Sequence, residues 1–265
     1  MRSWMLLIAL WLCAAIPALA APSQRVLFVG NSLTYYGNLP ATFAALAKAN
    51  GHDVQSEMIV KGGATLSQRL ADGSVQQALV ERRPAIVVLQ ERGGDLLCRR
   101  GTDACEQSRH AIAELSRAAR AVNARVLVLG TYQRVAQVSI ALVDAERAAA
   151  HHAGADYIEI SESLRRVSTQ LPDLPWYAAD GMHPGSALTL LNALQLHRTF
   201  YGPPATAHLQ VNAPIYSTDT GLEAQLRRAD AAPPRPGTPG GIVYEHEQVA
   251  RINNALGATH EANAR

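Results

Sequence analysis

The chain has 265 residues, 48% of them hydrophobic, which is enough to bury the core of one large domain or two small ones and excludes disorder over most of its length. Its formal net charge is +2 with 17% charged residues, so neither nucleic acid nor an acidic membrane surface is indicated as a partner. Three cysteines are an odd number, which would leave one thiol unpaired if the whole chain were secreted.

Residues 1–20 have the layout of a secretory signal peptide, with Arg2, an apolar run over 4–16 and a small-x-small ending at Ala20. The alternative is a membrane anchor, but the apolar run is shorter than the ~20 residues that a spanning helix needs. Cleavage after Ala20 predicts a periplasmic or extracellular protein, of bacterial origin, with no membrane anchor after cleavage. It also removes Cys13.

Cys98 and Cys105 are the two cysteines that remain after cleavage, seven positions apart. In an oxidising compartment such a pair predicts a disulfide that closes a small loop. The weaker alternative is two free thiols.

Short apolar runs alternate along the chain with longer patterns typical of helices. This alternation predicts a parallel sheet built from right-handed βαβ units, and therefore a flavodoxin-like three-layer α/β/α sandwich of about five strands. The predicted strands are 25–30, 54–60, 85–90, 125–130 and 156–160, and the helical patterns between them are 38–50, 64–82, 105–123 and 137–154.

A last helix of the α/β domain is predicted from Pro184 to residue 202, since proline is favourable at the first helical position. The domain would thus span 21–202. Seven of the 14 prolines lie after it, which predicts an extension over 203–265 that packs on the same domain. Within the extension, 242–257 has the pattern of one more amphipathic helix.

Ser32 follows the first predicted strand directly, in the sequence GNSLTYYGNLP. A serine at such a strand-to-helix turn presents its hydroxyl at the sheet edge, where its own N–H can also stabilise an oxyanion, as a nucleophile requires. The alternative is that Asn31, Ser32 and Thr34 are ordinary turn and cap residues.

Asp180 and His183 lie three residues apart in D-G-M-H, just before the last helix of the domain. A histidine that acts as a base needs a carboxylate on one ring nitrogen to fix its tautomer, and this spacing allows the contact. Alternatively, Asp180 caps the helix and His183 is incidental. No H-E-x-x-H motif and no paired C-x-x-C is present, so neither a metal nor a cofactor is predicted.

Gly63 and Gln90 follow the second and third predicted strands. A glycine offers an unobstructed N–H to a substrate, and glutamine offers a side-chain amide at the same sheet edge. Each also has a structural interpretation, Gly63 in a plain turn and Gln90 as a strand-end cap.

With Ser32 in G-N-S-L, Gly63 in G-G-A-T, Gln90 in V-L-Q-E and the D-G-M-H block, the chain resembles the SGNH hydrolase superfamily, also called GDSL-type esterases. The resemblance covers roughly residues 25–202. It implies Ser32 as nucleophile, His183 as base, Asp180 as the residue that orients the base, and an oxyanion hole from the N–H groups of Ser32 and Gly63 plus a side-chain amide. Two blocks depart from the family pattern: G-N-S-L replaces G-D-S-L, and Gln90 stands where the family has an asparagine.

The resemblance implies a secreted serine esterase that acts on short acyl or acetyl esters through an acyl-enzyme, with a small-molecule or glycan ester as substrate. Trp176, close to the D-G-M-H block, is a candidate platform for a sugar ring; alternatively it packs beneath the loop. Two alternatives without this activity are a non-catalytic carbohydrate-binding relative and a flavodoxin-like protein that binds phosphate or a cofactor. A P-loop is excluded because no G-K-[ST] follows the first strand.

Overall fold

The computed structural model describes residues 23–99, 101–205, 208–236 and 238–262. The predicted signal peptide, residues 1–20, lies outside this part of the chain. Among the described residues, no helix combines the length and the apolar character needed to cross a membrane.

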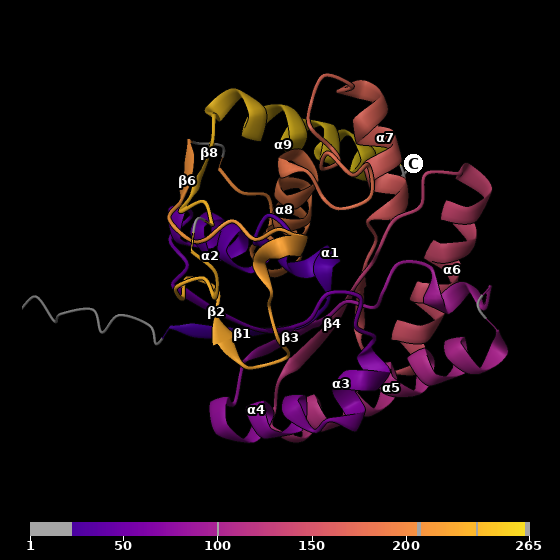
Figure 1. The fold of residues 1–265 in the computed structure, drawn as a ribbon. Helices are drawn as coiled ribbons and strands as arrows, with labels where there is room; N and C mark the ends of the chain where they lie inside the picture. Colours follow the sequence, from indigo (N-terminus) through magenta and orange to yellow (C-terminus); the bar gives the residue numbers. More distant parts are fainter. Residues whose placement is uncertain (1–22, 100, 206–207, 237, 263–265) are drawn as a thin grey trace, which may run out of the picture.

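A six-stranded sheet in the order β5-β4-β3-β1-β2-β7 forms the centre of the protein (Figure 1). Strands β1 to β5 run parallel, and β7 pairs antiparallel with β2. The five predicted strands are present in this sheet, and the prediction missed its sixth strand, β7. The strands are β1 (Gln24–Gly30), β2 (Val54–Val60), β3 (Ile86–Leu89), β4 (Arg125–Leu129), β5 (Asp156–Ile158) and β7 (Arg227–Arg228).

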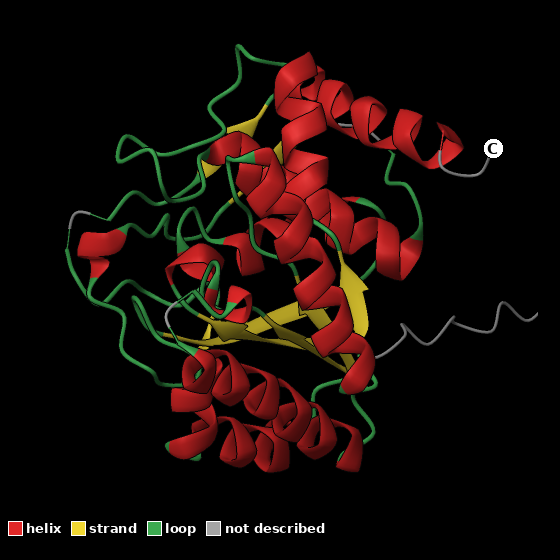
Figure 2. Ribbon diagram, turned by 90° about the vertical axis from the view of Figure 1, so that its right-hand side faces the viewer, coloured by secondary structure: helices red, strands yellow, loops and turns green. Residues whose placement is uncertain are grey.

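Helices cover both faces of this sheet, which confirms the predicted three-layer α/β fold (Figures 1 and 2). One face carries α2 (Leu39–Ala49), α7 (Ser161–Gln170), α8 (Ser186–Tyr201) and α9 (His246–Ala262). The other face carries α3 (Leu66–Ala71), α4 (Ser74–Arg82), α5 (Thr102–Ala121) and α6 (Ala136–His152).

The side chains of β1 point alternately to the two faces of the sheet, so this one strand contributes to both hydrophobic cores. Val26 and Phe28 enter the core beneath α2 and α8, whereas Leu27 and Val29 enter the core on the opposite face, and all four are fully buried. Successive side chains of a strand point to opposite faces, so a strand covered on both sides must be apolar at every position. This is why the strands read as nearly continuous hydrophobic runs.

Three predicted helix boundaries are wrong. The pattern over 64–82 forms two helices, because Gly73 adopts a positive φ of 72° between α3 and α4. The last helix of the domain starts at Ser186 rather than at Pro184, which instead forms an isolated bridge with Tyr177. The start of the predicted helix 242–257 is strand β8 (Ile242–Tyr244), where β-branched residues pair with β6 (Leu209–Val211).

The segment after residue 202 packs against the α/β domain rather than apart from it. It contributes β7 to the main sheet and α9 to one helical layer. Asn38, buried at the start of α2, donates from Nδ2 to the carbonyl oxygens of Pro214 (2.7 Å) and Ala229 (2.9 Å). These contacts connect the extension to the segment that follows β1.

Candidate active site

The candidate site lies at the carboxyl end of β1, between β3 and β2. The chain passes from β1 to β2 on one side and continues to β3 on the other, so the loops after these strands diverge at this point. In open α/β sheets, such a switch point is where ligands bind. Ser32 stands here as the first residue of the short helix α1 (Ser32–Tyr35).

The structure brings Ser32, His183 and Asp180 together in one chain of hydrogen bonds. Ser32 Oγ lies 2.9 Å from Nε2 of His183, although the two residues are 151 positions apart. Nδ1 of the same ring lies 2.6 Å from Oδ2 of Asp180. A ring that donates from Nδ1 to a carboxylate has its Nε2 lone pair free to accept the serine hydroxyl proton.

Asp180 is held as a carboxylate by donors from its own loop. Its Oδ1 accepts the N–H groups of Met182 (2.8 Å) and His183 (2.9 Å). The His183 N–H, the His183 ring and the Met182 N–H lower the pKa of Asp180 to about 2, in that order of importance. The group that orients His183 is therefore ionised throughout the neutral range.

Tyr132, which follows β4, fixes the D-G-M-H loop from outside. Its hydroxyl donates to the Met182 carbonyl oxygen at 2.6 Å. Burial raises the pKa of this hydroxyl, so it remains a donor.

A buried glutamate holds the start of the loop after β4, which carries Tyr132. Glu146 on α6 accepts the N–H of Thr131 (2.9 Å), the Thr131 hydroxyl (2.6 Å) and the Tyr157 hydroxyl (2.9 Å). Burial raises the pKa of Glu146 to about 7. The loop that carries Tyr132 is thereby attached to α6.

Asn31, directly before Ser32, caps α1 and ties it to β3. Its Oδ1 accepts the Leu33 N–H at 3.0 Å, and its Nδ2 donates to the Gln90 carbonyl oxygen at 3.3 Å. An aspartate could make the first of these contacts but not the second, because an ionised carboxylate has no donor. The amide therefore suits this packing better than the aspartate of a G-D-S-L motif would.

Gln90 does not direct its side-chain amide toward Ser32. Its Oε1 accepts the Thr34 hydroxyl at 2.7 Å, and its Nε2 donates to the Gly130 carbonyl oxygen at 3.2 Å. Only 1% of the residue is exposed. The Gln90 side chain thus cross-links the segments that follow β1, β3 and β4. These contacts favour the strand-end structural interpretation of Gln90, and its role as an oxyanion-hole amide stays a prediction.

Gly63 occupies the turn that follows β2, beside α1. The turn is closed by the Ala64 N–H, which donates to the Lys61 carbonyl oxygen at 3.2 Å, and Gly63 has a positive φ of 68° that disfavours other residues. A methyl group added to Gly62 would lie 3.1 Å from the Tyr35 hydroxyl, so the turn packs closely against the helix that Ser32 begins.

The residues after Gln90 form hydrogen bonds to the turn that contains Gly63 and to the start of α3. The buried carboxylate of Glu91 accepts the Leu66 N–H at 3.2 Å, and Arg92 Nη1 donates to the Gly63 carbonyl oxygen at 3.4 Å. Burial raises the pKa of Glu91, although the N–H groups that it accepts act in the opposite direction. Arg92 is in turn fixed by Asp95, whose Oδ2 lies 2.9 Å from Nε.

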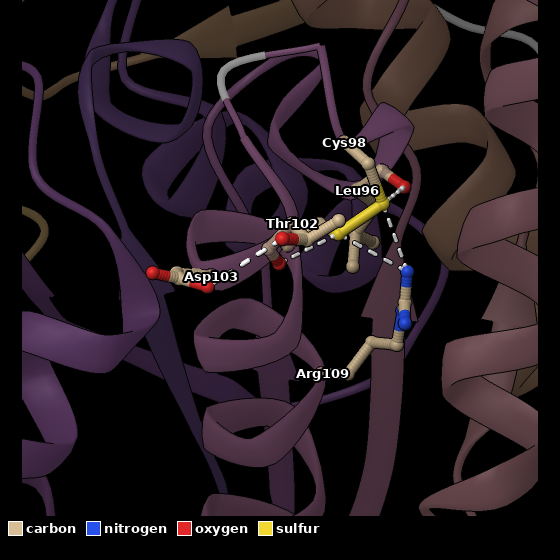
Figure 3. The surroundings of a disulfide bond; sticks show 6 residues. Leu96, Cys98, Thr102, Asp103 and Arg109 are labelled. Atoms are coloured by element: carbon tan, nitrogen blue, oxygen red, sulfur yellow. Dashed lines mark hydrogen bonds between the residues drawn. A yellow bond between two sulfur atoms is a disulfide. The ribbon is translucent and has the colours of Figure 1, made fainter.

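A disulfide joins Cys98, in the loop that continues from Asp95, to Cys105 in the first turn of α5, as predicted. Figure 3 shows the Arg109 side chain directed at the two sulfur atoms. Arg109 Nη2 lies 3.0 Å from Cys98 Sγ and 3.2 Å from Cys105 Sγ. This link closes the loop after β3 onto the first turns of α5.

Trp176 is not a sugar platform. It is 5% exposed, belongs to the core beneath α8, and donates from Nε1 to the Leu171 carbonyl oxygen at 2.8 Å. The aromatic residue that meets the site is Tyr36, whose ring is stacked on His183 with centroids 4.9 Å apart.

Sequence reasoning missed Tyr36, Tyr132 and Glu91 as parts of this site. Tyr132 and Glu91 each follow the end of a strand, which is a usable signal because parallel strands end at one edge. Tyr36 offers no such signal, since its neighbour His183 is remote in the sequence. In the described part of the chain, no group of three or more histidine, cysteine, aspartate or glutamate side chains could hold a metal ion.

Sequence comparison finds no matching protein-family model and no matching curated protein. Comparison of structures does find neighbours. One is a protein from Slackia heliotrinireducens described as an SGNH hydrolase, with a TM-score of 0.55 and 28% identity over 67% of this chain and 98% of that one. Another is TesA, with a TM-score of 0.53 and 23% identity over 67% and 98% of the two chains.

A third neighbour is an acetyl xylan esterase from Geobacillus stearothermophilus, with a TM-score of 0.54 and 12% identity over 69% of this chain and 96% of that one. The α/β fold described above therefore matches that of SGNH hydrolases. The neighbour at 28% identity supports a relation to SGNH hydrolases, whereas the other two show a shared fold.

Proposed function

We propose that this protein is a secreted serine esterase of the SGNH superfamily that hydrolyses short acyl esters. The observation that carries the proposal is the continuous contact from Ser32 Oγ through the His183 ring to the Asp180 carboxylate. A histidine with a purely structural role does not require a serine hydroxyl on one ring nitrogen and an ionised carboxylate on the other. Acyl transfer by a serine requires both contacts.

In the proposed reaction, His183 Nε2 takes the hydroxyl proton as Ser32 Oγ attacks the ester carbonyl carbon. The tetrahedral intermediate collapses, and His183 passes that proton to the departing alcohol, which leaves Ser32 acylated. Water then attacks the acyl group, gives its proton to His183, and releases the acid as Ser32 recovers its proton. Asp180 stays ionised and stabilises the imidazolium in both halves.

Backbone donors supply the proposed oxyanion hole. The Ser32 N–H is at the first position of α1, where a helix offers no internal acceptor, and Gly63 lies in the turn packed beside the same helix. Glu91 and Arg92 hold this turn in place. The proposed hole does not include Gln90, because its amide oxygen accepts from Thr34 and its amide nitrogen donates to Gly130.

The proposed location, outside the cytoplasm, rests on the layout of residues 1–20 and on the Cys98–Cys105 disulfide, which suits an oxidising compartment. Short acyl or acetyl esters of small molecules or glycans are the proposed substrates.

Labelling with a fluorophosphonate probe tests the mechanism. The purified protein should be labelled at Ser32, and Ser32→Ala should not react. His183→Asn provides the sharper test, because it keeps the nucleophile but removes its base and should slow labelling by at least ~10³-fold. Ser168→Ala is the matched control, since this serine lies on α7 and should leave labelling unchanged. An unlabelled wild-type protein with a native circular dichroism spectrum would overturn the proposal.

The acyl preference is tested with p-nitrophenyl esters of increasing chain length, together with acetylated oligosaccharides. Highest kcat/KM on acetyl and propionyl esters is expected. A preference for chains of eight or more carbons would contradict the assignment to short acyl groups while leaving the serine mechanism intact.

A further inference from the structure

Tyr36 covers one face of the His183 imidazole. The two ring planes are inclined by 12° with centroids 4.9 Å apart, within the range of offset stacking. Tyr36 is half-buried, and the His183 side chain is only 13% exposed. The stack leaves both ring nitrogens to their contacts with Ser32 and Asp180.

The backbone of Tyr36 is held by the extension and not by α1 alone. Tyr36 ends α1 in an extended conformation and forms an isolated parallel bridge with Tyr216. The next residue, Gly37, donates its N–H to the Tyr216 carbonyl oxygen at 3.0 Å, and Asn38 reaches the Pro214 carbonyl. The segment after residue 202 thus helps to hold the backbone that carries the Tyr36 ring.

We propose that Tyr36 is a positioning residue that keeps the His183 ring in the plane of the Ser32–Asp180 contact and stabilises the imidazolium through its π face. This inference rests on the proposed esterase function. The physical basis is that the face of an aromatic ring carries partial negative charge and attracts a cation placed over it. The ring gains this attraction only when His183 is protonated, which is the state that forms as Ser32 attacks.

Several other groups surround the His183 ring, and the test must leave all of them unchanged. Asp180 faces Nδ1 from the same loop, Ser32 faces Nε2 from α1, and Tyr132 bonds to the adjacent Met182 carbonyl from the loop after β4. Asp219, which lies in the extension, contributes a negative charge near Tyr36. Burial first, and then the charges of Asp180 and Asp219, raise the pKa of Tyr36, so its ring stays neutral over the working pH range.

Tyr36→Leu and Tyr36→Phe separate the π face from mere bulk. Leucine keeps apolar cover over the imidazole but has no π face, whereas phenylalanine keeps the face and loses only the hydroxyl. In NMR titrations of the His183 ring signal, Tyr36→Leu should move the midpoint down by roughly half a pH unit, and Tyr36→Phe should restore it. A His183→Asn spectrum assigns the signal.

Tyr201→Leu is a matched control, because Tyr201 is stacked on His52 in the same manner, at 3.8 Å and 11°. The Tyr201 hydroxyl bonds to Gln24 at the start of β1, whereas Ser32 follows the end of this strand. It should leave the His183 midpoint in place. In kinetics on a short acyl ester, Tyr36→Leu should lower kcat about three- to tenfold with little change in KM, and the acid limb of kcat/KM should move with the NMR midpoint.

The two proposals fail in different ways. An unchanged His183 midpoint in Tyr36→Leu, or a midpoint that Tyr36→Phe does not restore, overturns the role of Tyr36 even in an active esterase. A protein that lacks esterase activity but shows the expected midpoint shift would confirm the stabilisation of the imidazolium and refute the proposed function instead.

Discussion

Replacing Gln90 with leucine distinguishes a structural role of this residue from a catalytic one. The substitution keeps an apolar side chain of similar length in a site that is 1% exposed, but removes both hydrogen bonds of the amide. The Thr34 hydroxyl loses its acceptor at 2.7 Å, and the Gly130 carbonyl loses its donor at 3.2 Å. Both partner groups remain buried without a replacement.

The expected loss of stability follows from these two buried groups, which are left without hydrogen-bond partners. Each buried polar group left without a partner costs about 1–3 kcal/mol, so the loss of both partners in Gln90→Leu should lower the free energy of unfolding by roughly 2–6 kcal/mol. A donor in an oxyanion hole would behave in the opposite way, with a loss of ~10²–10³ in kcat and little change in stability.

The assay is urea unfolding, followed by kcat on a short acyl ester at a temperature where the variant is fully folded. We expect the full stability loss and a kcat within about tenfold of wild type. Gln77→Leu serves as control, because its amide bonds to Glu81 on an exposed helix surface and its loss should change stability by less than about 0.5 kcal/mol. An unchanged unfolding free energy with a kcat loss of 10² or more would refute the structural assignment of Gln90.

Three further predictions concern the loops around the site. Asn31→Asp should cost about 1–3 kcal/mol at neutral pH in urea unfolding, because a buried carboxylate would face the Gln90 carbonyl; a stabilised variant would contradict this. Since burial raises the pKa of Glu146 to about 7 from 4.5, its contribution to stability is complete below pH 4.5 and lost as the pH rises through 7. Glu146→Gln should therefore flatten the pH dependence of Tm between those values, and an unaltered profile would exclude this titration. Tyr132→Phe should reduce kcat about three- to tenfold with KM unchanged, because the Met182 carbonyl loses its donor; full kcat would show that the loop needs no such support.

The sequence alone was sufficient for the layers and the main strands. A strand buried on both faces has no polar position, so runs such as 25–30 and 125–130 are visible without any tertiary information. Parallel strands also end at a common edge, so the sequence alone predicts that Ser32, Gly63 and Gln90 lie near one another. The pairing of Cys98 with Cys105, which the structure confirms, was predicted from their number and from the secretion that the layout of residues 1–20 predicts.

The sequence could not determine where a polar side chain points once it reaches that edge. Gln90 has the amide that an oxyanion hole requires, but the carbonyl of Gly130 and the hydroxyl of Thr34 compete for it, and both come from other strands. Trp176 likewise follows its loop into the core instead of facing the site. Local patterns contain no information on such partners, because the partners are supplied by packing.

The extension shows the same limit at a larger scale. Strand β7 consists of two arginines, which no hydrophobic pattern would indicate as a strand, and it forms because β2 offers an open edge. The bridge between Tyr36 and Tyr216 joins segments 180 positions apart and brings an aromatic ring onto His183. The order of residues thus determined which groups reach the edge of the sheet, and only the tertiary structure decided which of them meet, since hydrogen bonds and stacking depend on distances that chain spacing does not encode.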